Sequence, residues 1–447
     1  MTKEKKESNM LTGVIWKELL LFFLPIAAGT LFQQLYNAVD AVIVGKFVGT
    51  EALAAVGGSP AVIVNLMVSI FVSLTTGASV IVAQLYGAGN HGELRKATGT
   101  AMTFFALLGI AITAFCEPLT DTMLRVLKTP ADTMTDAATY LRIYFAAFPF
   151  LLLLNAQSGI LRAVGDSRSP FLFMLIGCLT NILLDLLFVI RFRMGVAGVA
   201  WATDISILVN MVLTSWKLMS TKESYRLDLK FLRPDWRLVG NMMEIGIPSA
   251  LSGAMYGVSN AILQASVNAL GTQYVAAWAL SGKIDGVYWA TSGAFGSAVT
   301  TFIGQNYGAK KMDRVKKSTT VSFKVFEPLT VILCSAILLF GKDLLPLFTD
   351  DPEVIDLTIK VLLYFVPFYV VWTIIEILSG VMRGCGVVKV PVLINALCVC
   401  LFRVIWVATV CRVNLSLFNV SICYGISWLI CAFCMILYYR KWKRKTV

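Results

Sequence analysis

Twelve stretches of mainly apolar residues, each long enough to cross a membrane, follow one another along the 447-residue chain. A helix needs about 20 residues to cross the hydrocarbon core of a bilayer, which is about 30 Å thick. Charged residues make up only 14% of the chain, whereas soluble domains carry about a quarter. The sequence therefore predicts an all-α integral membrane protein with twelve transmembrane helices. The predicted spans lie near residues 16–44, 53–85, 98–116, 137–160, 170–190, 195–216, 241–268, 274–304, 319–340, 357–380, 391–411 and 417–439.

Lysines and arginines concentrate in the connecting segments that are cytoplasmic if both chain ends lie inside the cell. Because such residues are retained on the cytoplasmic side of membrane proteins, this bias predicts a multi-pass protein of the cell membrane with both termini inside. It also accounts for the formal net charge of +12, since these residues sit where topology and anionic lipid favour them. We therefore expect the lipid bilayer, and no nucleic acid, as a partner.

Two sequence blocks recur with the same offset of 221 positions. AQLYGAG at 83–89 matches GQNYGAK at 304–310, and LRAVGDSRSP at 161–170 matches MRGCGVVKVP at 382–391. Six spans in each half would make both halves enter the membrane from the same side, so the pseudo-two-fold axis would run along the membrane normal. The predicted organisation is an N-terminal six-helix lobe at 1–216, a cytoplasmic linker at 217–240 and a C-terminal six-helix lobe at 241–447. We interpret the repeated blocks themselves as tight turns and headgroup anchors.

Carboxylates and amides stand within the spans of the first lobe. Placing the Asp40 carboxylate at the centre of a bilayer costs on the order of 3 kcal/mol. We therefore expect its side chain to face protein or water and to have a functional role. Asn37, Tyr36 and Gln33 precede it by three, four and seven residues and share its helix face. In span 5, Asn181 and Asp185 are four residues apart and also share one face, and the neighbouring spans contribute further polar side chains. These are Asn155 and Gln157 in span 4 and Thr203 and Asp204 in span 6.

Two carboxylates in one poorly hydrated site can hold a proton or a cation and respond to losing it. Asp40 and Asp185 are the candidates for this pair. In the alternative interpretation, they are hydrogen-bonded structural groups, and Asp204 faces the linker or pairs with a basic residue.

The second half does not repeat this polar pattern. An aliphatic residue, Ile262 or Leu263, aligns with Asp40, while Glu376 aligns with Asn155. Lys283 and Asp285 are near neighbours that could neutralise each other. The asymmetry predicts that ion handling belongs to the first lobe.

The sequence offers no motif that favours catalysis or cofactor binding. Cys431 and Cys434 form a CxxC, but within an apolar span they are interpreted as buried small residues. His91 is the one histidine and falls in a polar loop, the ten cysteines are scattered, and no GxxxxGK[ST] loop occurs. A histidine-based metal centre, a Ser-His-Asp triad and ATP hydrolysis are therefore not expected. We expect a transporter, not an enzyme, without a cofactor other than a coupling ion.

The chain resembles the multidrug and toxic compound extrusion (MATE) transporters, most closely their DinF-like branch. The resemblance rests on VDAVIVGKFVGTEALAAVG at 39–57, on NILLDLLF at 181–188 and on the two repeated blocks. It implies a MATE/MOP-type fold and antiport, in which H⁺ or Na⁺ enters while amphipathic, mostly cationic compounds leave by alternating access through a V-shaped cavity between lobes.

The resemblance also implies which residues bind the coupling cation and which line the substrate cavity. Asp40, Asn181, Asp185 and Thr203 would bind the coupling cation, with Na⁺ at these four residues as one possibility. The predicted substrate cavity contains Gln33, Tyr36, Asn37, Asn155, Tyr256 and Glu376. Tyr256 stands where the NorM-like branch has a glutamate. A cation site like the one in the second lobe of that branch is therefore not expected, unless Glu376 supplies a carboxylate for it.

Three alternatives to a drug antiporter fit the sequence less well. A lipid-linked oligosaccharide flippase of the same superfamily would favour basic cavity residues and further spans. An intramembrane enzyme would need a nucleophile or metal constellation, and a channel would not need two equal lobes. The favoured prediction is a monomeric efflux antiporter whose partners are small amphipathic or cationic drugs.

Overall fold

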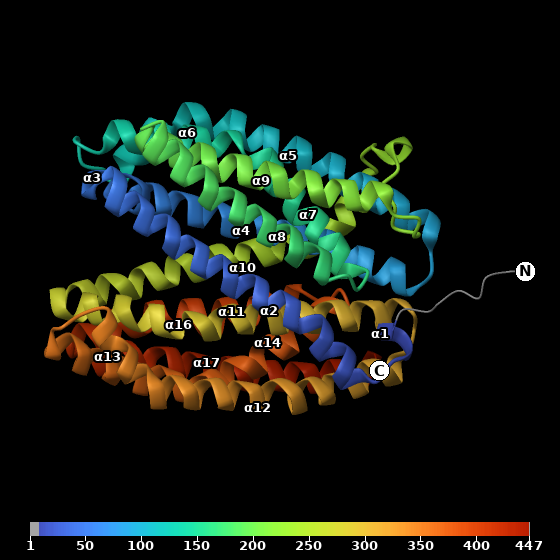
Figure 1. Ribbon diagram of the computed structural model, residues 1–447. Helices are drawn as coiled ribbons and strands as arrows, with labels where there is room; N and C mark the ends of the chain where they lie inside the picture. Colours follow the sequence, from blue (N-terminus) through green and yellow to red (C-terminus); the bar gives the residue numbers. More distant parts are fainter. Residues whose placement is uncertain (1–8, 447) are drawn as a thin grey trace, which may run out of the picture. The chain divides into compact units, whose positions relative to one another are not determined.

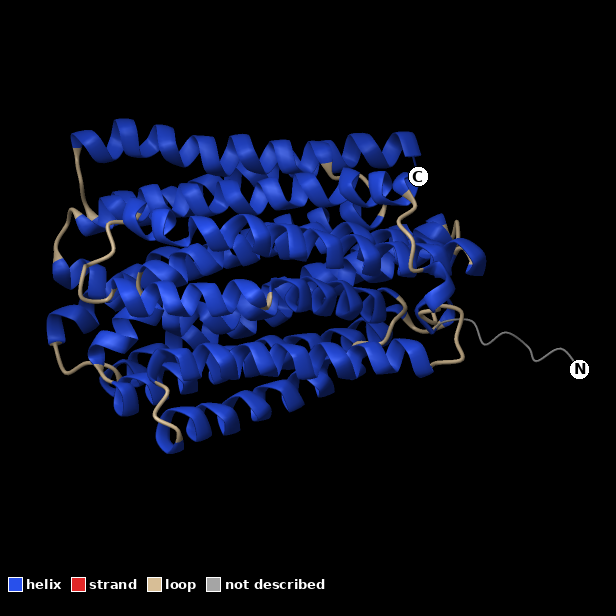
Figure 2. Ribbon diagram, turned by 90° about the horizontal axis from the view of Figure 1, so that it is seen from above, coloured by secondary structure: helices blue, strands red, loops and turns tan. Residues whose placement is uncertain are grey.

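The computed structural model describes residues 9–446, apart from the side chains of 38, 41, 42, 50, 51, 53, 54 and 446. All regular elements in this part of the chain are helices, joined by short loops (Figure 2). The helices up to the long linker are α1 (Asn9–Thr12), α2 (Ile15–Ile43), α3 (Thr50–Gly57), α4 (Ser59–Gly87), α5 (His91–Val126), α6 (Met134–Ala146), α7 (Phe148–Ala163), α8 (Arg168–Asp185) and α9 (Gly195–Ser220). Those after it are α10 (Trp236–Asn268), α11 (Thr272–Gly308), α12 (Met312–Leu344), α13 (Pro352–Phe365), α14 (Tyr369–Gly384), α15 (Lys389–Asn395), α16 (Phe402–Trp406) and α17 (Leu417–Thr446).

Short helical segments of a different pitch continue several of these helices. Four are π-helical: η1 (Val44–Val48), η2 (Leu186–Arg191), η6 (Ala396–Leu401) and η7 (Val407–Cys411). Three are 3-10 turns: η3 (Leu229–Phe231), η4 (Leu345–Leu347) and η5 (Val366–Phe368).

Nine helical stretches in the described residues are long and apolar enough to cross a membrane, and a tenth is formed if α6 and α7, which meet at a 48° bend, count as one span. These ten coincide with ten of the twelve predicted spans. The other two predicted spans correspond to α10 and α11, which have 33 and 37 residues. Both are long enough but carry many Gly, Ser, Thr and Asn residues, so they are less apolar than the others. The count of twelve therefore stays a prediction, while the multi-pass membrane character is clear.

The described residues divide into two compact units. One is Leu24–Ala250, and the other combines the residues up to Phe23 with those from Leu251 onward. The divisions fall inside α2 and α10 and not in the segment 217–240, so each of these long helices contributes to both units. The predicted lobe boundaries were placed between predicted membrane spans, whereas the two units are defined by contacts between helices. The lobe boundaries therefore remain a prediction.

In the unit Leu24–Ala250, helices α4, α5, α7 and α9 run side by side, and α8 packs along α9 (Figure 1). Fully buried Phe105, Phe145 and Phe148 contribute to the core between these helices. Glycines allow α4 and the first part of α10 to approach closely. A Cβ atom on Gly77 would overlap the main-chain carbonyl oxygen of Met242. The close crossing of α4 and α10 therefore depends on glycine, which has no side chain, at position 77.

In the other unit, α11 packs against α12, α13 and α14, and α14 also packs against α17 (Figure 1). Its core is rich in aromatic side chains. The Tyr288 and Tyr369 rings stack with centroids 4.1 Å apart and parallel planes, and Trp428 lies 5.9 Å from Tyr369. Phe23 of α2 contacts Phe295 in the same unit at 5.0 Å. Stacked aromatic pairs of this kind add to the stabilisation from burial alone.

The two repeated blocks form equivalent turns, as predicted. Two residues after α4 and α11 end, Gly89 and Lys310 have positive φ angles of 68° and 58°. Two residues after α7 and α14 end, Gly165 and Gly386 have φ angles of 96° and 81°. A left-handed residue just beyond a helix satisfies its last carbonyl groups and reverses the chain, and glycine favours this conformation. The 221-residue offset is therefore a repeat of structure and not only of sequence.

Candidate functional site

A cavity of about 670 Å³ lies within the unit Leu24–Ala250. Residues of α2, α4, α6, α7, α8 and α9 form most of its wall. Six residues predicted from the sequence are among those that line it: Gln33, Tyr36, Asn37, Asp40, Asn155 and Thr203. One apolar-looking span thus contributes a continuous polar face, because Gln33, Tyr36, Asn37 and Asp40 recur at helical spacing.

Asn181 and Asp185, also predicted from the sequence, do not line this cavity and are completely buried. The carboxyl groups of Asp185 and Asp40 are close enough to interact directly. Among the residues that the structure describes, both Asp185 oxygens and Oδ1 of Asp40 are buried without a hydrogen-bond partner. The same is true of both amide atoms of Asn181. Sequence spacing alone could not show this, since it required α2 and α8 to bring the two carboxylates together.

Buried polar atoms without partners are costly, by about 1 to 3 kcal/mol each and more for charged groups. A proton shared by the two carboxyl groups, or a cation between them, would remove this cost. Carboxylate, amide and hydroxyl oxygens are the ligands that hard cations prefer. Thr203 donates its hydroxyl hydrogen to the Val199 carbonyl at 3.1 Å, which leaves the oxygen lone pairs available. The four predicted cation residues therefore have suitable chemistry, although their role as ligands stays a prediction.

The helix that carries Asp185 changes pitch directly after it. The π-helical segment η2 begins at Leu186, and such π-helical turns occur frequently at functional sites. Asp204, on α9, is 7% exposed, and its Oδ1 has no partner among the described residues. It does not line the cavity in this structure, and no described ion pair supports the interpretation that it pairs with a basic residue.

Several polar residues of the cavity wall were not predicted: Asn65, Tyr140, Tyr144, Arg162, Ser206 and Asn210. Two of them could have been predicted from the sequence, because Ser206 and Asn210 follow Thr203 by three and seven residues on one face of α9. Nothing in the sequence predicts that Asn65 and Arg162 line the cavity, since the sequence does not show which way α4 and the end of α7 orient their side chains.

Tyr256 and Glu376, also predicted for the substrate cavity, belong to the other unit and do not line this cavity. Tyr256 packs edge-on against Trp372 at 5.7 Å. Glu376 forms an ion pair with Arg383, at 3.7 Å between Oε1 and Nη2. Their role in substrate binding stays a prediction.

The suggestion that Lys283 and Asp285 neutralise each other is wrong. Residues two apart on a helix point in different directions, and no ion pair joins these two in the described part of the chain. The ammonium group of Lys283 lies 5.5 Å from the Phe348 ring. Asp285 is buried and accepts hydrogen bonds from the Tyr369 hydroxyl and, at 3.4 Å, from the Trp289 indole.

Removing the Tyr369 hydroxyl should destabilise the protein. In Tyr369→Phe, the buried Asp285 carboxylate loses a donor, which should lower the free energy of unfolding by about 1 to 3 kcal/mol. Thermal melting of the purified protein in detergent measures this. Tyr364→Phe is the matched control, because that ring packs on Phe418 and its hydroxyl bonds to no other described residue. Equal melting temperatures for the two variants would contradict the prediction.

Two further charged residues lie inside spans of the second unit. Arg403 is 2% exposed, bonds Asn260 and Ser427 at 3.0 and 3.2 Å, and lies 3.9 Å from the Tyr424 ring centroid. Glu327 was missed by the sequence reasoning, and neither of its buried oxygens has a partner among the described residues. A lack of carboxylates in the second half therefore does not support the predicted restriction of ion handling to the first lobe, which stays a prediction.

Comparison with known proteins identifies the family. The MatE family model matches residues 25–187 and 248–409. The chain is 28% identical over 388 residues to the probable multidrug resistance protein YoeA of Bacillus subtilis, covering 85% of this chain and 84% of that protein. It is 27% identical over 441 residues to the probable multidrug resistance protein YpnP of the same organism, covering 98% of each.

A solved structure described as the outward-facing conformation of a multidrug resistance MATE family transporter of the MOP superfamily has the same fold. It superposes with a TM-score of 0.91 over 99% of each chain, at 23% sequence identity. The predicted all-α transporter fold is thus confirmed. The family model covers most of the chain and matches both of its halves, so this protein belongs to the MatE (multidrug and toxic compound extrusion) family of membrane transporters.

Proposed function

We propose that this protein is a cation-coupled multidrug efflux antiporter, which exchanges H⁺ or Na⁺ for amphipathic, mostly cationic compounds by alternating access. The observation that carries this proposal is the pair of carboxylates formed by Asp40, which lines a polar cavity, and the completely buried Asp185, with three buried oxygens between them that have no hydrogen-bond partner among the described residues. The relatives named as probable multidrug resistance proteins support the substrate class. We further propose that it works as a monomer in the cell membrane with both termini cytoplasmic.

Cation binding and drug binding would exclude each other through Asp40. This residue lines the cavity and also contacts Asp185, so one side chain belongs to both sites. With a proton or Na⁺ on the carboxylate pair, Asp40 no longer attracts a cationic drug. When the cation leaves, the negative charge becomes available to the drug again. A membrane potential of 100 mV supplies about 2.3 kcal/mol for each charge that moves through it.

The cavity wall suits many flat compounds. Tyr36, Tyr140 and Tyr144 supply aromatic surface, and Met174 supplies a flexible apolar side chain. Such surfaces accept varied ligands because they can repack. The flippase alternative has less support, because Arg162 is the one basic side chain among the lining residues that the structure describes.

Reconstituted liposomes test the coupling directly. We expect ethidium export to follow an imposed pH gradient or an imposed Na⁺ gradient, each applied without the other, because only one ion is coupled. Ethidium fluorescence measures the movement. Dissipating the active gradient with an ionophore should stop export and serves as the control. If ethidium moves under neither gradient, the antiport proposal fails.

A further inference from the structure

Arg162 and Arg383 are equivalent residues of the two repeats, 221 positions apart, but they have different surroundings. Arg383 pairs with Glu376, seven residues earlier on α14, at 3.7 Å. The residue equivalent to Glu376 in the first repeat is Asn155, seven residues before Arg162 on α7. The first repeat therefore keeps the arginine but has an amide in place of the carboxylate.

Arg162 lines the cavity together with Asn155. Its main-chain carbonyl accepts a hydrogen bond from Gly165 at 2.9 Å, but its side chain forms no ion pair and no hydrogen bond with any other residue that the structure describes. Asn155 uses its amide nitrogen to donate to the Leu151 carbonyl at 2.8 Å, and its neutral oxygen cannot balance a positive charge. A charged group away from bulk water is costly unless an opposite charge compensates it. The guanidinium, with its five donors, is suited to a carboxylate or phosphate partner.

Arg162 and Asp40 mark opposite ends of the cavity. The Phe32 ring of α2 lies 6.1 Å from the Phe171 ring of α8, so Phe32 marks the level of the first turn of α8 on α2. Arg162 precedes α8 by only a short turn and shares this end of the cavity. Asp40 is eight residues beyond Phe32, or about 12 Å along α2 at 1.5 Å per residue. The cavity thus has one positive end and one negative end.

We propose that Arg162 binds an anionic group, a carboxylate or phosphate, of the transported compound. The preferred substrates are then amphipathic zwitterions, with the anionic group at Arg162 and the cationic part directed toward Asp40. This inference rests on the proposed efflux function and refines its substrate class. Purely cationic compounds still bind at the Asp40 end but gain nothing from Arg162.

A pair of probes that differ in one charge tests the proposal. Norfloxacin is a zwitterion at neutral pH, and its ethyl ester keeps the ring system and the cation but lacks the carboxylate. Fluorescence titration of the purified protein in detergent gives both dissociation constants without any ion gradient. We expect the wild-type protein to bind the acid at least about tenfold more tightly than the ester, as a charge-assisted bidentate contact of about 1.5 to 3 kcal/mol implies.

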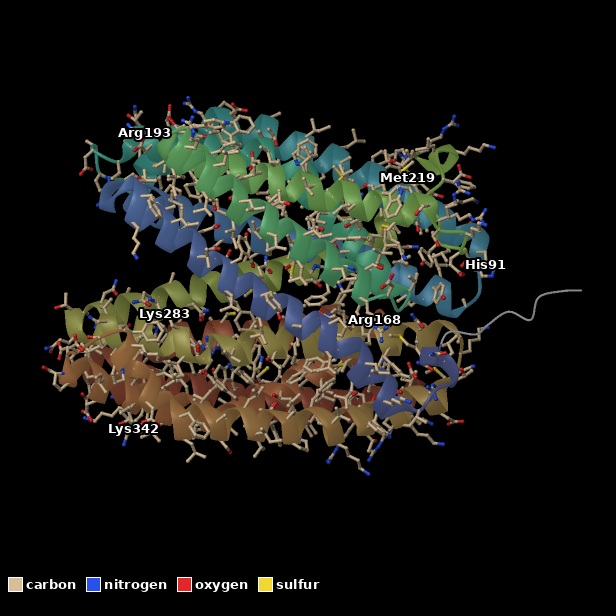
Figure 3. The ribbon with its side chains drawn as sticks, viewed as in Figure 1. His91, Arg168, Arg193, Met219, Lys283 and Lys342 are labelled. Atoms are coloured by element: carbon tan, nitrogen blue, oxygen red, sulfur yellow. The ribbon has the colours of Figure 1, made fainter. Side chains whose placement is uncertain are left out.

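Two variants should remove this preference by different routes. Arg162→Gln deletes the charge, and Asn155→Glu supplies the arginine with the internal carboxylate that Arg383 already has. In both, the acid-to-ester ratio should fall to about one, because the acid loses its charge-assisted contact. Arg168→Gln is the matched control, because Arg168 is exposed and does not line the cavity. Figure 3 labels Arg168, which is the first residue of α8. It should keep the wild-type ratio.

The proposal is overturned if Arg162→Gln and Asn155→Glu keep the wild-type ratio, or if they weaken acid and ester equally. It is also overturned if added phosphatidylglycerol abolishes the preference in the wild type, since Arg162 would then bind a lipid headgroup. Failure of the efflux function would look different: the binding ratio would persist, but no gradient would move either compound across a liposome membrane.

Discussion

Asp40→Asn is expected to abolish gradient-driven export of ethidium from liposomes, down to the leak of protein-free liposomes. Asparagine keeps the size and polarity of the side chain but has neither a negative charge nor a carboxyl proton to gain and lose. Because Asp40 lines the cavity and also contacts Asp185, the exchange between drug and coupling ion would lose its shared group. Asp185→Asn should have the same effect, since the pair acts as one site.

Asp285→Asn provides the control for a buried carboxylate as such. Asp285 is also buried in the membrane-spanning part, but it lies in the other unit and accepts hydrogen bonds from Tyr369 and Trp289. An asparagine oxygen can accept the same bonds, so this variant should export ethidium at a rate near that of the wild type. Wild-type export by Asp40→Asn, at equal protein content, would refute the coupling role.

Gly77→Leu is expected to prevent recovery of folded protein, and Gly77→Ala to lower its stability by about 1 to 3 kcal/mol. Even one methyl group on Gly77 would meet the main-chain carbonyl oxygen of Met242, and a backbone atom cannot turn aside as a side chain can. The contact is reciprocal, since a Cβ atom on Gly246 would lie 2.6 Å from the Leu74 carbonyl oxygen. Overlap on this scale would force α4 and α10 apart.

Gly240 offers the matched comparison on the same helix, α10. It is exposed, and a Cβ atom there would meet nothing within 4 Å. Gly240→Ala should raise stability by up to about 1 kcal/mol, because glycine in a helix interior costs that much relative to alanine. The two alanine variants should therefore shift the melting temperature of the purified protein in opposite directions. A shift in the same direction would show that the α4 and α10 crossing tolerates a side chain.

Much of the architecture was predictable because the bilayer restricts a spanning chain to helices of a known length. Runs of apolar residues therefore predicted ten of the stretches that the structure contains. The length and hydropathy criterion that these ten stretches meet does not identify α10 and α11 as spans, because their small and polar residues lower the mean hydropathy. Those residues pack helices together: Gly246 of α10 meets α4, and Gly296 of α11 meets Glu376 of α14.

Helical periodicity also predicted which polar residues of one helix share a face. Gln33, Tyr36, Asn37 and Asp40 all line the cavity. Periodicity could not predict contacts between helices, and it failed for Lys283 and Asp285. Their closeness in sequence suggested a pair, but the partners of Asp285 come from Trp289 one turn away and from Tyr369 on another helix.

The sequence by itself determined the membrane-spanning helices, the 221-residue repeat with its equivalent turns, and the polar face of α2. Each of these depends on residues that are near one another in the chain or on the bilayer as a solvent. Only the tertiary structure decided that Asp185 meets Asp40, that Arg162 lines a cavity, and that Arg383, its equivalent, pairs with Glu376. Those contacts depend on how helices far apart in sequence are rotated and packed, which hydropathy and spacing do not specify.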